Sequence, residues 1–226
     1  MPPFAYRRPS NSASRQYKKQ RKEDYMITIN INGRKVELPD DLAQQLIENH
    51  GVPQKTLADT AAGDTVKIGN FELIVLEQFA DGTTALLWKD ALKQMVFGKD
   101  NNYNGSDADK ACNKFAEELA GIVGEENIIL HEVDLTADDG LKGYGKIQRN
   151  ASLRTANMQR KYVEILDKYR LDIWEWLATA FSIPPHDEDN WVKCVSPSGC
   201  IYSRYYDFVR GVRPFCILKS NIFVSE

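Results

Sequence analysis

One amphipathic segment, residues 106–123, does most to limit the folds open to this chain. Its apolar side chains recur at helical spacing and fall on one stripe. They are Ala108, Ala111, Cys112, Phe115, Leu119, Ile122 and Val123. Ser106 is a favourable N-cap, and Asp109 three positions later completes a capping box. A helix with one apolar stripe buries it against a neighbouring element, so we predict a helix packed on a sheet, with Cys112 as a buried small hydrophobe.

Runs of strand composition lie on both sides of this helix. Three of them precede it, joined by turn signals, at 65–68, 71–77 and 84–88. A strand at 128–135 and a second helix at about 155–169 follow it, and further strands are expected at 174–179 and from 191 to the end. The order of strands, helix, helix and then short strands in long loops predicts an α+β domain and not a βαβα fold.

The N-terminal 25 residues are rich in Arg, Lys, Ser and Pro and show no apolar periodicity, so we expect residues 1–25 to be a disordered leader. The segment R-K-E-D-Y before Met26 is what a ribosome-binding sequence would encode if it were read in frame. Our hypothesis is that Met26 is the natural start and that the leader is not translated natively. The alternative is a basic arm that touches nucleic acid.

Residues 26–60 predict a small β-hairpin–helix appendage. Asn32-Gly33 stands between two alternating runs, which is the strongest short signal for a hairpin. A short amphipathic helix is expected from Asp40 to Asn49. The appendage is too small for a substantial core of its own, so we expect it to serve docking or homo-oligomerisation. The main domain is predicted to occupy residues 64–226.

The composition excludes several classes of protein. A chain of 226 residues has room for one sizeable domain, and its formal net charge of -3 is not that of a general nucleic-acid binder. Its cysteines show no C-x-x-C spacing and its histidines no H-E-x-x-H pattern, so we predict neither a metal nor a cofactor. The acidic turn at 136–140 lacks the ligand order of a calcium loop, and no nucleotide-binding or hydrolase motif is present. No apolar run approaches the roughly 20 residues that span a bilayer, and no signal peptide is recognisable.

Aromatic residues concentrate in the last quarter of the chain. Trp174 and Trp176 alternate with charge and, with Trp191, are predicted to be structural anchors. The segment from Tyr202 to Tyr206 is different, because consecutive residues cannot all face a core from a regular strand. Tyr, Ser, Gly and Arg are the residue types that antibody paratopes use, so we predict a recognition surface here.

Three motifs in this region resemble an uncharacterised domain of gut Firmicutes and their phages. They are W-x-W-L-A-T at 174–179, W-V-K-C-V-S-P-S-G at 191–199 and G-V-R-P-F-C-I-L-K-S at 211–220. The resemblance extends back to about Asp64 and so covers the main domain. The chain departs from that pattern at Glu175, inside the tryptophan motif, and at Ala180-Phe181, where a proline is usual.

The resemblance implies a C-type-lectin-like fold, distantly similar to formylglycine-generating-enzyme-type domains. Such a fold has two helices flanking small antiparallel sheets, and a long loop region that presents the ligand-binding residues. It also implies that Gly211, Arg213 and Pro214 belong to a structural strand that holds this region on the core. The segment before that strand, 194–210, would then lie on the exposed binding face.

Some members of the domain family resemble variable proteins of diversity-generating retroelements, which rewrite adenines so that AAY codons become NNY. NNY codons never encode Lys, Glu, Gln, Met or Trp, and residues 194–218 contain none of these five types. The predicted ligand-binding positions are Cys194, Ser196, Ser198, Cys200, Tyr202, Ser203, Arg204, Tyr205, Tyr206, Phe208 and Arg210. Val195, Ile201 and Val209 are expected to point inward.

The sequence thus predicts a non-enzymatic protein that binds a protein or glycan ligand, with a host-cell surface molecule as its partner if it belongs to a phage particle. An alternative is a formylglycine-generating-type enzyme, for which Cys194 and Cys200 would be the reactive pair. A second alternative is an intracellular phage-encoded interaction or inhibitor protein. The location stays open between a phage virion, the bacterial cytoplasm and the bacterial surface.

Overall fold

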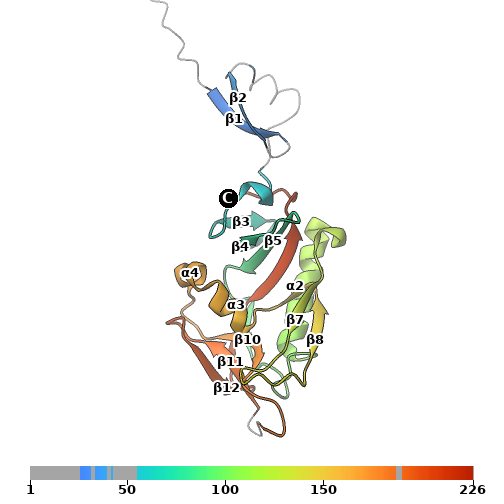
Figure 1. Cartoon of the computed structure of the whole chain (residues 1–226), viewed down its shortest axis with the longest axis vertical. Helices are drawn as coiled ribbons and strands as arrows, with labels where there is room; N and C mark the ends of the chain where they lie inside the picture. Colours follow the sequence, from blue (N-terminus) through green and yellow to red (C-terminus); the bar gives the residue numbers. More distant parts are fainter. Residues whose placement is uncertain (1–25, 32–33, 40–41, 43–54, 187–189, 226) are drawn as a thin grey trace, which may run out of the picture. The chain divides into compact units, whose positions relative to one another are not determined.

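The computed structural model describes residues 26–31, 34–39, 42, 55–186 and 190–225. The chain divides into two compact units, residues 1–53 and 54–226 (Figure 1), and each is described by itself. In the first unit, β1 (Met26–Ile31) pairs antiparallel with β2 (Arg34–Pro39), with Ile31 opposite Arg34. The predicted leader, the Asn32-Gly33 turn and nearly all of the predicted 40–49 helix lie outside the described residues.

The first sheet of the second unit has five strands in the order β3-β4-β5-β14-β9, all paired antiparallel. Figure 1 labels β3, β4 and β5 of this sheet. The strands are β3 (Thr65–Ile68), β4 (Phe71–Gln78), β5 (Thr83–Trp88), β14 (Pro214–Lys219) and β9 (Ala151–Leu153). The last strand, β14, is therefore inserted between β5 and β9. Early and late parts of the unit share this sheet.

Both faces of the first sheet are buried. In β4, Leu73 and Val75 pack with the helix residues Phe115 and Leu119 on one face. The intervening Ile74 and Leu76 pack on the other face with Tyr162 and Leu166. Because successive strand residues point to opposite faces, a run of apolar residues without polar interruption is what a sheet covered on both sides requires.

The second sheet has the order β12-β11-β10-β13-β6. Its strands are β12 (Ile201–Tyr205), β11 (Trp191–Val195), β10 (Glu175–Ala180), β13 (Arg210–Val212) and β6 (Lys93–Met95). Only β10 and β13 pair in parallel among these described strands. The central strand β10 is buried at every residue, and Trp176 at its second position is fully buried and donates from Nε1 to the carbonyl of Met95 at 3.0 Å.

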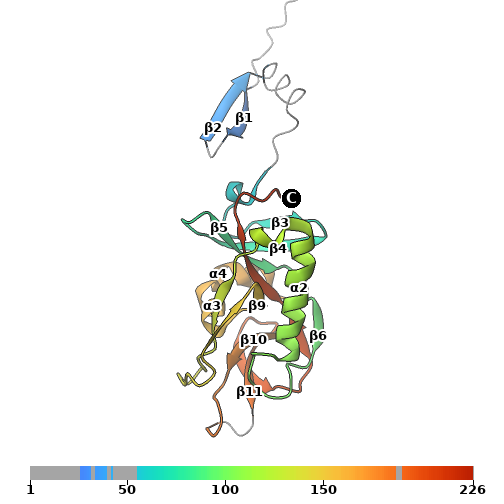
Figure 2. The same ribbon diagram turned by 90° about the vertical axis from the view of Figure 1, so that its right-hand side faces the viewer.

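The long helix α2 (Asp107–Val123) supplies side chains to the cores of both sheets. Figure 2 shows α2 running lengthwise along the unit. Phe115 and Leu119 belong to the core of the first sheet, and Ala108 and Cys112 pack with Trp176 of the second. The opposite face of the first sheet is covered by α3 (Ala156–Lys161) and α4 (Val163–Leu166), followed by the 3-10 turn Asp167–Tyr169. A separate hairpin pairs β7 (His131–Asp134) with β8 (Lys146–Arg149).

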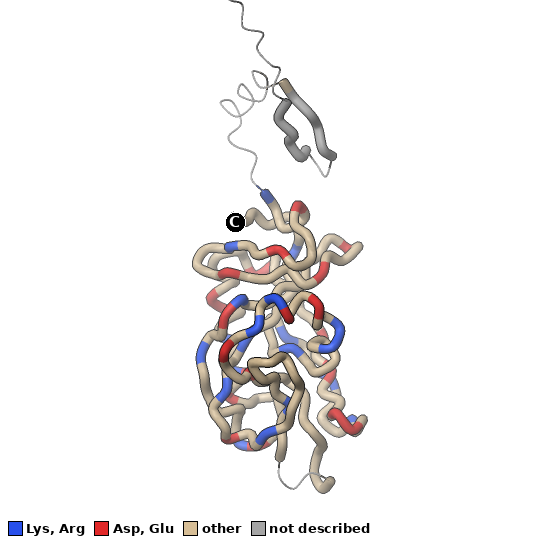
Figure 3. Tube along the Cα trace, turned by 90° about the vertical axis from the view of Figure 1, so that its left-hand side faces the viewer, with Lys and Arg blue, Asp and Glu red and all other residues tan. Residues whose placement is uncertain are grey.

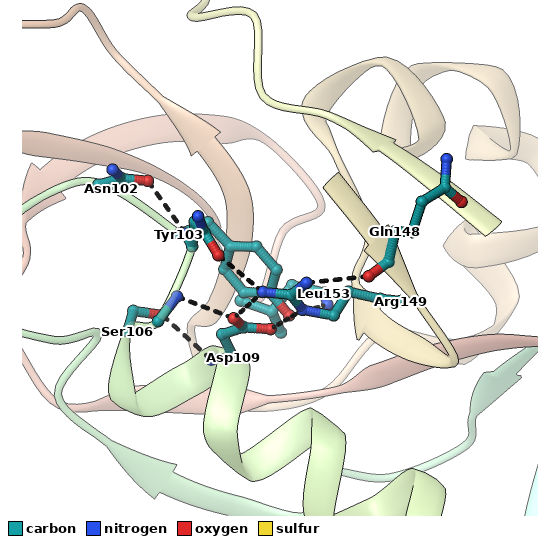
Figure 4. Close-up of polar contacts among 9 residues, drawn as sticks. Asn102, Tyr103, Ser106, Asp109, Gln148, Arg149 and Leu153 are labelled. Atoms are coloured by element: carbon teal, nitrogen blue, oxygen red, sulfur yellow. Dashed lines mark hydrogen bonds and ion pairs between the residues drawn. The ribbon is translucent and has the colours of Figure 1, made fainter. Parts of the chain in front are cut away.

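A polar network anchors the start of α2 (Figure 4). The Oγ of Ser106 accepts the backbone N–H of Asp109 at 3.0 Å, as the N-cap prediction required. The Asp109 carboxylate does not complete the capping box. It accepts Gly105 N–H at 2.9 Å and a bidentate pair from Arg149, at 2.8 and 2.7 Å. Asp109 is 1% exposed, so this ion pair ties the helix start to the β7–β8 hairpin in a buried setting.

The predicted α+β class is confirmed, and the predicted amphipathic helix is present. Ile122, expected on its apolar stripe, is instead 48% exposed. The predicted 155–169 helix is broken into α3, α4 and a 3-10 turn, and the predicted 128–135 strand is shorter, since β7 spans four residues. None of the helices in the described part of the chain is both long and apolar enough to cross a bilayer.

Candidate ligand-binding face

The predicted recognition segment forms the edge of the second sheet. β11 and β12 are joined as a hairpin, with Cys194 opposite Tyr202 and Val192 opposite Arg204. Residues directly opposite each other in an antiparallel pair share a face. Val192 and Cys194 are both fully buried in the core beside Trp176, so Tyr202 and Arg204 continue that core face to the outer edge of the sheet.

One tyrosine and two arginines contact the half-buried Trp174, and Phe208 contacts one of these arginines. Tyr202 lies edge-on to the Trp174 ring, with 5.3 Å between centroids. The guanidinium carbons of Arg204 and Arg210 lie over the same ring, at 5.1 and 5.3 Å from its centroid. Arg210 also lies 5.0 Å from the ring of Phe208. We call Trp174, Tyr202, Arg204, Phe208 and Arg210 the Trp174 cluster.

A second aromatic group lies on the other face of the hairpin. Tyr205 is opposite Trp191 in the β11–β12 register, and their rings meet edge-on at 5.5 Å. Phe181 adds a third ring, 6.0 Å from that of Trp191, with the ammonium of Lys193 at 5.6 Å from its centroid. Since Tyr205 is an odd number of residues from Tyr202 and Arg204 along β12, the predicted residues divide between two faces instead of forming one.

Exposed apolar side chains are concentrated in this part of the chain. Tyr202, Tyr205 and Phe208 are each 40–43% exposed, and Phe181 is 43% exposed. Val209 is 52% exposed, so the expectation that it points inward is wrong. It follows the Tyr205 end of β12 in a turn that leads to β13, where strand alternation does not apply.

Burial corrects two of the predicted binding positions, Cys194 and Ser196, and a third, Tyr206, contributes to the core. Cys194 is fully buried in the core of the second sheet and cannot touch a ligand. Ser196 is 7% exposed, and its hydroxyl hydrogen-bonds that of Ser198 at 2.8 Å. Tyr206 is half-buried, packs against the same core, and accepts Phe97 N–H at its backbone carbonyl. Ser198 and Cys200 are exposed at the hairpin turn, and Ser203 is half-buried in β12.

The buried position of Cys194 also favours the protonated form of its thiol. Burial raises the pKa of Cys194 above its ordinary value, although the positive charges of Arg210 and Arg204 oppose this. A protonated thiol without solvent access is a poor nucleophile. Cys194 therefore acts as a small core residue, and Cys200 is the exposed member of the pair.

The structural residues predicted after this segment hold it to both sheets. Gly211 lies where an added Cβ would be 2.8 Å from Ile173 Cδ1 and 3.3 Å from the carbonyl oxygen of Trp174, so a side chain there would force Ile173 to shift. Its N–H donates to that carbonyl at 2.7 Å. Pro214 then begins β14 in the first sheet, so the chain passes from one sheet to the other at Arg213.

Arg213 is part of a buried ionic group that the sequence did not reveal. The Glu175 carboxylate lies 2.9 Å from Arg154 Nη2 and 3.4 Å from Arg213 Nη1, and all three side chains are nearly inaccessible. Arg213 also donates to the carbonyls of Trp88 and Lys89, at 2.7 Å each. Burial lowers the pKa of Arg213 to about 10, which Glu175 opposes. Glu175, the residue that departs from the tryptophan motif, is thus the shared counter-ion of two arginines that adjoin the paired strands β9 and β14.

Of the three tryptophans predicted to be structural, Trp176 is a core residue, whereas Trp174 and Trp191 are half-buried and each contacts a β12 tyrosine. No pattern in the sequence assigned Phe181 or Lys193 to the second group. Two hollows of about 490 and 510 Å³ are lined by residues outside the Trp174 cluster. The first is lined by Asp90, Lys93 and residues 170–173 among others, and the second by parts of α2 and residues 148–150.

Comparisons with family models, with curated proteins and with solved structures found no match. Among the described residues, no three His, Cys, Asp or Glu side chains come together as a metal site would need. Figure 3 shows basic and acidic residues interspersed along the described trace of the second unit. The geometry of the candidate face is therefore what the functional proposal has to rest on.

Proposed function

We propose that this chain is a non-enzymatic ligand-binding protein whose Trp174 cluster and neighbouring β12 residues recognise a protein or glycan. We further propose that its second unit has a C-type-lectin-like fold and that it is a target protein of a diversity-generating retroelement, of phage or bacterial origin. The observation that carries the proposal is the Trp174 cluster itself, in which two arginines lie over one tryptophan ring beside the exposed rings of Tyr202 and Phe208.

Several features of the architecture support the C-type-lectin-like part of the proposal. Helical segments lie on opposite faces of the first sheet, α2 on one and α3–α4 on the other. The final strand β14 joins the first sheet beside β5, and the segment before it forms the outer hairpin of the second sheet. This is the arrangement expected of that fold, with the variable segment outside and the last strand in the core.

The Trp174 cluster has the composition of a binding hot spot. Tyr, Trp and Arg are the residue types that carry most of the binding energy at protein interfaces. Rigid rings lose little conformational entropy on binding, and arginines stacked on aromatic rings are held in place before the ligand arrives. Tyr202 and Phe208 offer exposed apolar area beside two guanidiniums that are already oriented by Trp174.

The pattern of burial along the segment is compatible with diversification. Ser198, Cys200, Tyr202, Tyr205 and Phe208 are exposed, and NNY codons encode all of these residue types. Their replacement would change the surface and leave the core intact. The buried Val192 and Cys194, which lie opposite Arg204 and Tyr202 in the hairpin, would hold the scaffold constant.

The DNA that flanks the gene tests the diversification directly. We expect a near-identical template repeat of the codons for residues 194–218, with adenines at the variable positions, and a reverse transcriptase gene close by. Flanking DNA without either element, in a complete genome or phage sequence, contradicts the retroelement part of the proposal and leaves the binding part to be tested separately.

The binding part is tested with two codon libraries of the same size. In one, NNY codons replace those of Ser198, Tyr202, Arg204, Tyr205 and Phe208. In the matched control library, they replace five buried codons, those of Val192, Cys194, Trp176, Val212 and Phe215. We expect most members of the face library to resist protease on the surface of yeast, and most members of the control library to be cleaved. Selection of the face library against unrelated targets should yield binders, and a face library that unfolds as often as the control contradicts the proposal.

A further inference from the structure

The two arginines of the Trp174 cluster stand apart from the other arginines of the chain. Every other arginine whose side chain the structure describes pairs with a carboxylate: Arg149, Arg154, Arg160, Arg170 and Arg213. No described carboxylate forms an ion pair with Arg204 or Arg210. Two like charges therefore lie over one ring without a counter-ion from the described part of the chain.

Most of the hydrogen-bonding capacity of these two groups has no acceptor in the described part of the chain. A guanidinium has five N–H donors. Arg204 donates from Nη1 to the carbonyl of Ser203 at 2.8 Å, and Arg210 donates from Nη1 to that of Val209 at 2.8 Å. Arg210 Nε is buried and has no hydrogen-bond partner among the described atoms. The terminal nitrogens of a half-buried guanidinium form a planar donor fork, which suits a carboxylate because a carboxylate accepts two parallel bonds.

The position of Trp174 argues against a neutral sugar as the group that is bound. A tryptophan that stacks on a sugar has to present an open ring face. The ring of Trp174 is instead covered by two guanidiniums at 5.1 and 5.3 Å and met by the edge of Tyr202 at 5.3 Å. The exposed apolar area beside the arginines belongs to Tyr202, Phe208 and Val209, a mixture typical of a protein interface.

We propose that the partner of the Trp174 cluster is a protein segment that presents carboxylates. Its Asp or Glu side chains would supply the missing counter-ions of Arg204 and Arg210, while its apolar residues contact Tyr202 and Phe208. This inference rests on the proposed function, because it assigns a ligand chemistry to the same face. It goes further in selecting an acidic protein over a neutral protein or a glycan.

The test is selection of a phage-displayed library of random dodecapeptides on the full chain. Three forms are compared: the natural sequence, the double variant Arg204→Gln/Arg210→Gln, and the double variant Lys114→Gln/Lys146→Gln. The two lysines are exposed and paired with glutamates, so the control loses the same two positive charges at other sites. An array of neutral and acidic glycans is probed in parallel with the same three proteins.

We expect peptides selected on the natural sequence to be enriched in Asp and Glu beside aromatic or aliphatic residues. The best of them, as a synthetic peptide, should bind the arginine variant at least about 30-fold more weakly, as for truncation of hydrogen-bonded charge pairs at an interface. The lysine variant should stay within about twofold of the natural sequence, since exposed pairs contribute little.

Four outcomes overturn the inference. Selected peptides that are neutral or basic but depend on Tyr202 would refute the acidic partner and leave the proposed function standing. Acidic glycans bound through the two arginines, with no peptide selected, would assign the face to another class of partner. Equal loss of acidic-peptide binding in both double variants would show that the peptide responds to the net charge of the protein and not to Arg204 and Arg210. If neither library nor array yields a ligand for the natural sequence, the inference and the proposed function both fail.

Discussion

Replacement of Glu175 by glutamine removes one charge from the buried group that joins the two sheets. Glu175 is 3% exposed and is the only described carboxylate that forms an ion pair with Arg154 or Arg213, each of which is 1% exposed. Glu175→Gln keeps the shape of the side chain and its carbonyl acceptor. It leaves two buried guanidiniums facing each other across a neutral amide.

The expected loss of stability follows from the burial of the three charged side chains. Removing one partner of a buried ion pair typically destabilises a protein by about 3–5 kcal/mol, because the remaining charge is left uncompensated. Arg154 retains its bond to Gln159 at 2.6 Å, and Arg213 retains two backbone carbonyls, so we expect the lower end, about 3 kcal/mol. For a domain of 150–250 residues this corresponds to a fall in Tm of about 6–12 °C.

Urea unfolding followed by circular dichroism measures the difference. The matched control is Glu77→Gln, which breaks a pair with the 55% exposed Lys161 and should cost less than about 1 kcal/mol. The variant Glu175→Gln/Arg154→Gln should recover part of the loss, because it removes one of the two unpaired charges. A Glu175→Gln variant that loses no more stability than Glu77→Gln would refute the account of the buried group.

Three further predictions concern the core and the face. Burial lowers the pKa of His131 to about 4 from its ordinary 6.5, so the folded state binds its proton less tightly than the unfolded state. The free energy of unfolding should therefore fall by about 3 kcal/mol between pH 7 and pH 4 because of this residue. Guanidinium chloride unfolding of His131→Phe at both pH values should show that this contribution to the pH dependence is lost. Gly211→Ala should lower the free energy of unfolding in urea by about 1–3 kcal/mol, because its Cβ would lie 2.8 Å from Ile173 Cδ1. An unchanged free energy of unfolding would show that Ile173 moves aside without cost. Tyr202→Ser and Phe208→Ser should each change the unfolding free energy by no more than about 0.5 kcal/mol, and a larger loss in calorimetry would mean that these rings are structural.

Local patterns predicted the elements that local forces determine. The stripe from Ala108 to Leu119 and the N-cap at Ser106 gave α2, since helical spacing and capping act within a few residues. The same reasoning placed Ile122 inside, although its side chain lies beside Gly69 in the turn between β3 and β4 and is 48% exposed. The break after Lys161 was not foreseen, because Tyr162 and Leu166 fit a continuous helical stripe equally well.

The candidate site was likewise predictable from local sequence only in part. The composition of 194–210 indicated a surface, and five of its predicted binding residues are exposed. Which residues face inward depends on the register of β12 against β11 and on the burial of β10, neither of which is encoded locally. Trp174 and Trp176 have the same local pattern, yet Trp176 is fully buried and Trp174 is half-buried under two arginines. The pairing of Glu175 with Arg154 and Arg213 joins three distant segments, so no window of sequence contains it.

Whether ligand binds at the Trp174 cluster is tested most directly by an amide and indole NMR titration of the chain with the tightest ligand recovered from the peptide library and the glycan array. Binding at this cluster predicts that the largest chemical-shift changes fall on the Trp174 indole N–H and on the amides of residues 202–210. Changes centred instead on the hollow beside Asp90 and Arg170, or on the hollow beside Asn113 and Gln148, would contradict it.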